Sequence, residues 1–205
     1  VMDLTRTGLE AYSVGSSTLS YRRLKQVEGK SDRSLDEYAF IEAARRFTQK
    51  GGQIAVAGIS LKSPGTLYVA ACNRPVFIVR KPGSSEYMVV SDINAALGLF
   101  PQSRIQEVTG KYEQLIRLRD RHLYDSKAKG ESDAGIEADF EQKIDQVLKG
   151  FQVEVFPLEG GQIFARIVTM MKDGRPVRRL TVSSFDGVPL HEIGPELVCL
   201  TPPHI

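Results

Sequence analysis

The sequence predicts an α+β fold in which antiparallel sheets carry an inserted helical hairpin. Between residues 53 and 92, four short runs rich in β-branched and aromatic residues follow one another closely. Parallel crossovers need about a dozen residues, so this spacing indicates antiparallel pairing. The runs are nearly continuous in apolar residues, which indicates strands covered on both faces. Residues 102–150 then become charged and helical in pattern, before strand patterns return.

The chain should begin with a short strand over residues 9–14 and a basic helix over residues 18–28. A stronger helix should start after Ser34 and end at "QKGGQ". Ser34 and Glu37 fit a capping box, in which the hydroxyl and the carboxylate each accept a backbone N–H. The apolar residues that follow at helical spacing predict that one broad face of this helix is buried.

Seven strands are expected in the body of the chain. Glycine, proline, serine or asparagine bounds each run, which is the usual punctuation of strands. Asp173-Gly174 is a strong signal for a two-residue hairpin turn. "INAALGLF" should form a short helical run, and the proline-rich segment 186–205 should wrap the surface. The strand segments are "QIAVAGIS", "TLYVAACN", "PVFIVRK", "EYMVVSD", "FQVEVFPLE", "GQIFARIVTM" and "PVRRLTVSSF".

Two amphipathic helices are expected over residues 111–124 and 135–148, joined by a charged, solvated loop. Their apolar stripes are narrow, so we expect a peripheral hairpin that a short linker could replace without unfolding the sheets. The whole chain, residues 1–205, then reads as a single domain with a helical insertion at about 102–150. The candidate inner positions are Tyr112, Leu115, Ile116, Leu123, Ile136, Phe140, Ile144, Val147 and Leu148.

Composition excludes several classes of function. The net charge is +2, and no apolar run approaches the roughly 20 residues of a membrane-spanning helix, so neither nucleic acid nor membrane is expected as a partner. Cys72 and Cys199 lie in apolar contexts, which favours buried thiols in the cytoplasm over a disulfide. His122, His191 and His204 lack ligand spacing, so no metal site is expected. Nucleotide-binding glycine motifs are absent, and no cofactor is expected.

Several ordered motifs resemble one family. "PGTLYVAACNRPVFIV", "VVSDINAAL" and "LEGGQIFARI" follow the capped helix in this order. They resemble the second half of the class II glutamine amidotransferase domain of glucosamine-6-phosphate synthase (glutamine–fructose-6-phosphate aminotransferase). The resemblance covers about residues 4–99 and 151–183, and the helical hairpin has no counterpart in it. It implies a partial α-β-β-α sandwich of the N-terminal-nucleophile hydrolase type.

The resemblance also implies what this chain lacks. Family members attack glutamine with an N-terminal cysteine whose α-amine serves as base. This chain starts at Val1, and Cys72 and Cys199 carry no free α-amine, so we expect no catalytic residue here. By position only, Ser17 and Thr18 correspond to an Asp-Thr pair that binds substrate in the family. A serine cannot supply the charge that pairs with the substrate ammonium.

The resemblance therefore predicts part of a glutamine amidotransferase that releases ammonia from L-glutamine for amino-sugar synthesis. The isolated chain should be inactive, and its partners would be the missing first half of the domain or sugar-isomerase-type domains. Strands such as "QIAVAGIS" would lose neighbours without that first half. We therefore expect the missing half as a separate chain, self-association of this chain, or the helical insertion to cover them. One alternative is a diverged, non-catalytic amidotransferase-fold module for assembly or regulation. Another is an unrelated α+β domain.

Overall fold

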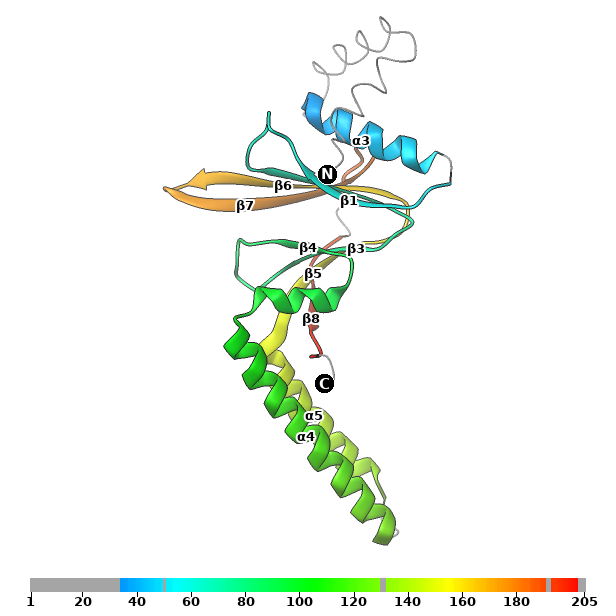
Figure 1. The fold of residues 1–205 in the computed structure, drawn as a ribbon, viewed down its shortest axis with the longest axis vertical. Helices are drawn as coiled ribbons and strands as arrows, with labels where there is room; N and C mark the ends of the chain where they lie inside the picture. The colour runs from blue at the N-terminus through cyan, green and yellow to red at the C-terminus, as the bar shows by residue number, and fades with distance from the viewer. Residues whose placement is uncertain (1–33, 50, 130–131, 191–192, 203–205) are drawn as a thin grey trace, which may run out of the picture. The chain divides into compact units, whose positions relative to one another are not determined.

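The computed structural model describes residues 34–49, 51–129, 132–190 and 193–202, and it divides the chain into two compact units (Figure 1). The first unit comprises Val1–Val76 and Pro157–Gly194, and the second comprises Phe77–Phe156 and Pro195–Ile205. Helices and two four-stranded antiparallel sheets confirm the α+β class. The strand and helix predicted before residue 30 lie outside the described residues.

The described helices comprise three α-helices and two short 3-10 helices. The two amphipathic helices of the predicted hairpin are both present, although the first begins nine residues before its predicted start and ends five residues after its predicted end. The helices are α3 (Leu35–Thr48), η1 (Ile93–Leu99), α4 (Gln102–Lys129), α5 (Ala134–Leu148) and η2 (Lys149–Phe151).

All seven predicted strands are present, and an eighth, β8, lies in the segment predicted to be surface coil. The strands pair in the orders β1-β2-β6-β7 and β4-β3-β5-β8. Two neighbours in sequence, β2 and β3, therefore lie in different sheets and do not form a hairpin. The strands are β1 (Ile54–Ile59), β2 (Thr66–Cys72), β3 (Val76–Arg80), β4 (Met88–Val90), β5 (Gln152–Leu158), β6 (Gln162–Lys172), β7 (Arg175–Ser184) and β8 (Glu196–Cys199).

The first unit is built on the sheet β1-β2-β6-β7, with α3 packed on one face of it (Figure 1). Phe40 of α3 lies against Tyr68 of β2 and Phe164 of β6, with ring centroids 5.6 and 6.3 Å away. The centroids of Tyr68 and Phe164 are 6.0 Å apart. A Cβ at Gly58 of β1 would lie 3.0 Å from the Phe40 ring, so a side chain there would push the ring slightly away from the strand.

The strands of this sheet differ in how far they are covered. The side chains on both faces of β2 are buried from Tyr68 onward, as the near-continuous apolar pattern predicts. β1 instead alternates half-buried and exposed positions, and Ile59 at its end is 74% exposed. β6 and β7 form the predicted hairpin, with Lys172 paired to Arg175. Both turn residues between them, Asp173 and Gly174, have positive φ, as a type I′ turn requires.

The second unit has its own core beneath the sheet β4-β3-β5-β8. Fully buried Phe151 and Val153 lie at its centre, and the Phe100 ring meets Phe151 edge-on at 5.2 Å. Ile105 and Val108 from the first turns of α4 pack into the same cluster. The base of the hairpin is therefore part of the core and is not peripheral, contrary to the sequence-based expectation.

Beyond this base, α4 and α5 lie side by side and form a long arm (Figure 1). Buried Phe140 of α5 contacts the His122 ring of α4, with centroids 5.6 Å apart. Tyr112 of α4 and Leu148 of α5 are also buried. The predicted inner positions of both helices are all buried or half-buried, and most of the other positions are polar.

Candidate functional site

Of the residues that the sequence singled out, the two cysteines lie in the described part of the chain and the expected substrate-binding pair does not. Ser17 and Thr18, the expected substrate-binding pair, lie outside the described residues. Cys72 is a buried free thiol at the end of β2. Cys199 on β8 is also a free thiol but is only half-buried, which corrects the expectation that both are buried. Neither is joined in a disulfide.

Three of the four buried polar residues of the described chain, Asp36, Glu37 and Ser60, lie at or beside the first turn of α3. Asp36 is 4% exposed and accepts hydrogen bonds from the hydroxyls of Ser60 at 2.6 Å and Ser63 at 3.3 Å. Ser60 in turn accepts the backbone N–H of Lys62 at 3.1 Å. These bonds satisfy the buried carboxylate and hold the β1–β2 turn against the start of the helix.

Glu37, the next residue of α3, forms an ion pair with a strand of the sheet below the helix. Its carboxylate accepts a hydrogen bond from Nη1 of Arg166 at 2.9 Å, and its side chain is 4% exposed. The Ser34 hydroxyl accepts the Glu37 backbone N–H at 3.3 Å, which confirms the serine half of the predicted capping box. The Glu37 side chain binds an arginine of β6. The Nε of Arg166 is buried and has no hydrogen-bond partner among the described residues.

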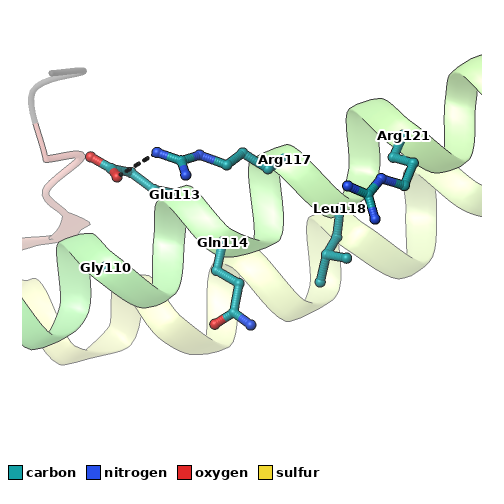
Figure 2. A pocket seen from close by; sticks show the side chains of 6 residues that line it. All are labelled: Gly110, Glu113, Gln114, Arg117, Leu118 and Arg121. Atoms are coloured by element: carbon teal, nitrogen blue, oxygen red, sulfur yellow. Dashed lines mark hydrogen bonds and ion pairs between the residues drawn. The ribbon is translucent and has the colours of Figure 1, made fainter.

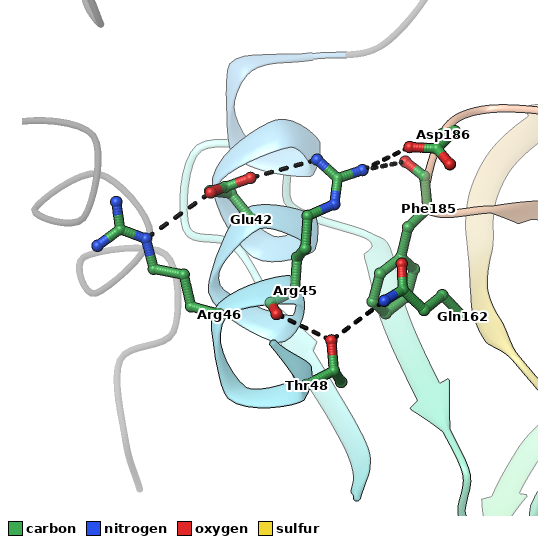
Figure 3. Close-up of polar contacts among 7 residues, drawn as sticks. All are labelled: Glu42, Arg45, Arg46, Thr48, Gln162, Phe185 and Asp186. Atoms are coloured by element: carbon green, nitrogen blue, oxygen red, sulfur yellow. Dashed lines mark hydrogen bonds and ion pairs between the residues drawn. The ribbon is translucent and has the colours of Figure 1, made fainter. Parts of the chain in front are cut away.

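The other end of α3 is tied to the same sheet (Figure 3). Arg45 donates to the Asp186 carboxylate at 2.9 Å and to the Phe185 carbonyl at 3.3 Å, both just after β7. Gln162, the first residue of β6, donates from its side chain to the Thr48 hydroxyl at 3.3 Å. The Gln162 carbonyl accepts the Phe185 N–H at 3.0 Å.

These contacts define one polar frame around α3. Arg166 and Gln162 of β6 hold the two ends of the helix, through Glu37 and Thr48 respectively. The groups that could act as nucleophile or base are enclosed, since Ser60 is 6% exposed and Asp36 less. The frame positions the helix on the sheet, and its chemistry is that of a structural network.

A second polar cluster lies in the other unit, around Arg80 of β3. Arg80 pairs with Glu154 of β5 and donates to the Tyr87 hydroxyl at 2.9 Å. Its guanidinium also lies 5.4 Å from the centre of the Tyr87 ring and 5.6 Å from that of Phe156. Burial opposes the charged form of Arg80, but Glu154 and Tyr87 outweigh it and raise the pKa of the guanidinium. Arg80 therefore stays charged and links the two neighbouring strands.

The described residues contain neither a metal-ligand cluster nor a membrane-spanning helix. In that part of the chain, no three His, Cys, Asp or Glu side chains are grouped as metal ligands. No described helix is long and apolar enough to cross a membrane. Comparison with known protein families, with curated proteins and with solved structures finds no match to this chain.

Sequence reasoning found Ser34 and Glu37 but missed their long-range partners. Glu37 is paired with a residue 129 positions away, and Arg45 with one 141 positions away. Arg166 carries one signal, since it is a charged residue in the otherwise apolar run "IFARIV". A charge in such a run requires a partner if it is buried, although the sequence does not say which carboxylate supplies it.

Proposed function

We propose that this chain is part of a glutamine amidotransferase of the glutamine–fructose-6-phosphate aminotransferase type. The described residues provide the sheet scaffold of its glutaminase domain. L-glutamine is the substrate of the complete enzyme, and the ammonia released from it serves amino-sugar synthesis. Sugar-isomerase-type domains are the partners that would use this ammonia.

One observation carries this proposal. The motif segments "PGTLYVAAC" and "GGQIFARI", distant in the sequence, form adjacent antiparallel strands, with Thr66 opposite Val168 and Cys72 opposite Gln162. The capped helix that precedes the first motif packs on this same pair of strands through Phe40. All the segments that carry the resemblance in this unit therefore belong to one helix-on-sheet layer. Such a layer supports an α-β-β-α sandwich of the N-terminal-nucleophile hydrolase type as the complete fold.

The catalytic nucleophile is assigned to residues other than the described ones. This chemistry needs a thiolate whose own α-amine is free. Cys72 and Cys199 are both internal, and the first is 4% exposed. The described residues therefore act by shaping the domain, and the nucleophile comes from another segment or another chain.

A second candidate is a non-catalytic module of the same fold that serves assembly or regulation. The α4–α5 arm favours it, because the arm has no counterpart in the resembled family and carries charges along its length. In this case glutamine chemistry would be absent, and the arm would provide the functional surface.

Ammonia release from L-glutamine separates the two candidates. The purified chain alone should release none, because its cysteines cannot act as N-terminal nucleophiles. Mixing it with the nucleophile-bearing first half of a glucosamine-6-phosphate synthase glutaminase domain should produce ammonia, and a Cys→Ala change at that partner's nucleophile should abolish it. A silent mixture would favour the non-catalytic module. Ammonia from the chain alone that is lost in Cys72→Ala or Cys199→Ala would refute the scaffold role.

A further inference from the structure

The two helices of the arm carry opposite charge. α4 contains seven Lys or Arg and four Asp or Glu, a net charge of +3, whereas α5 contains one Lys and four Asp or Glu, a net charge of −3. Among the described residues, the ion pairs of the arm lie within a single helix, such as Lys143 with Asp139. Within α4, hydrogen bonds from Lys111 and Arg104 hold the pKa of the Glu107 carboxyl below its usual value. Among the described residues, the opposite charges of α4 and α5 therefore do not neutralise each other through ion pairs between the two helices.

The acidic charge of α5 is arranged as a stripe. Glu137, Glu141 and Asp145 follow one another at intervals of four residues, which places them on one side of the helix. All three are exposed, and none forms an ion pair within the described part of the chain. We call these three residues the acidic stripe.

A groove with the opposite character lies on α4 (Figure 2). Its volume is ≈ 200 Å³, and a side chain at Gly110 would project into open space. Leu118 offers an apolar surface that is 38% exposed, and Arg117 and Arg121 border it one helical turn apart. Arg117 also pairs with Glu113 at 3.4 Å, and its side chain remains 81% exposed (Figure 2). We call this the α4 groove, and it is lined by Gly110, Glu113, Gln114, Arg117, Leu118 and Arg121.

We propose that two copies of the chain associate through their arms, with the acidic stripe of each copy lying on the α4 groove of the other. The spacing matches, because both the carboxylates and the arginines recur every four residues, about 6 Å along a helix. A two-fold contact requires both complementary surfaces on one chain, and the arm supplies both. The inference is independent of the glutamine chemistry.

The apolar side chains between α4 and α5 are incompletely buried, which supports a second copy of the chain as the partner. A pair of helices covers each seam from one side, whereas a four-helix bundle encloses it. Six aliphatic side chains of the arm are half-buried, and association of two arms would cover them further. They are Leu115, Ile116, Leu123, Ile136, Ile144 and Val147.

Charge reversal with exchange tests the proposal by sedimentation velocity on the full chain. The groove variant is Arg117→Glu with Arg121→Glu, and the stripe variant is Glu137→Lys, Glu141→Lys and Asp145→Lys. Each alone should weaken the dimer by about tenfold or more in Kd, because like charges then face each other. An equimolar mixture of the two should form a heterodimer, since every contact in it joins opposite charges.

The control is Lys172→Glu with Arg175→Glu, a charge reversal at the exposed β6–β7 turn, which should leave the dimer unchanged. Far-UV circular dichroism should show that all variants keep the native helix content. A monomeric wild-type chain at about 100 μM would overturn the proposal. So would a dimer insensitive to both variants, or two folded variants that stay monomeric when mixed, which would leave an acidic or basic segment of another protein as the occupant.

Discussion

Replacing Phe164 by alanine should lower the free energy of unfolding by about 3–5 kcal/mol. Phe164 is 2% exposed, and its ring packs against both the Phe40 ring of α3 and the Tyr68 ring of β2. The substitution removes one of the three rings of this cluster and leaves a cavity beside the other two. Total stability is only about 5–15 kcal/mol for a domain, so the variant should unfold at much lower urea concentration.

Met171→Ala is the matched control, because it removes a large apolar side chain from the same strand. Met171 is 70% exposed, so its loss should change stability by no more than about 0.5 kcal/mol. Urea titrations followed by circular dichroism compare the two variants. Equal midpoints would mean that the aromatic cluster does not hold the first unit together.

Deleting the whole hairpin, residues 102–150, should abolish the cooperative unfolding of the second unit. The deletion takes Ile105 and Val108 out of the core and uncovers Phe151 and Val153. Each uncovered large side chain gives up roughly 1.5–3 kcal/mol of burial. Two or three such losses approach the total stability of a small domain.

A trimmed variant separates the base of the hairpin from the arm. Replacing residues 116–140 by a short Gly/Ser linker keeps Ile105, Val108 and Tyr112 in place, and removes Phe140 together with its partner His122. This variant should retain a cooperative melt and slow hydrogen exchange in β5. If the full deletion melts as cooperatively as the trimmed variant, the base of the hairpin is not part of the core.

Local signals in the sequence predicted much of the fold. Strand patterns located all seven predicted strands, because a short apolar run bounded by turn residues is compatible with few structures other than a buried strand. Asp173 and Gly174 both adopt the positive φ that their turn type requires. Ser34 caps α3 through the bond expected from its spacing to Glu37. In each case the residues that carry the signal also make the contact.

The remaining features depend on contacts between distant segments. The segment "CNRP" does not indicate that β2 and β3 belong to different sheets, since a turn of the same sequence could connect two strands of a hairpin. Periodicity also placed the start of the first hairpin helix at residue 111, whereas α4 begins at Gln102 and its first turns pack Ile105 and Val108 into the core. β8 was missed because "ELVC" is short and lies among prolines, and pairing with β5 orders it.

The candidate site shows the same division. The spacing of Ser34 and Glu37 was enough to predict the helix start, but the Glu37 carboxylate is paired with Arg166 of a strand far along the chain. Capping predicted a local partner for that carboxylate, and the half-buried guanidinium of Arg166 supplies a distant one. Local rules therefore identified polar residues of the frame around α3 without showing what they hold together.

A crystal structure of the full chain tests the amidotransferase proposal most directly. The proposal predicts that the sheet β1-β2-β6-β7 and the sheet β4-β3-β5-β8 stack face to face, with α3 on the outer face of the first sheet. That arrangement is the α-β-β-α sandwich of N-terminal-nucleophile hydrolases. Two sheets that instead lie edge to edge, or that pack on separate cores without facing each other, would contradict it.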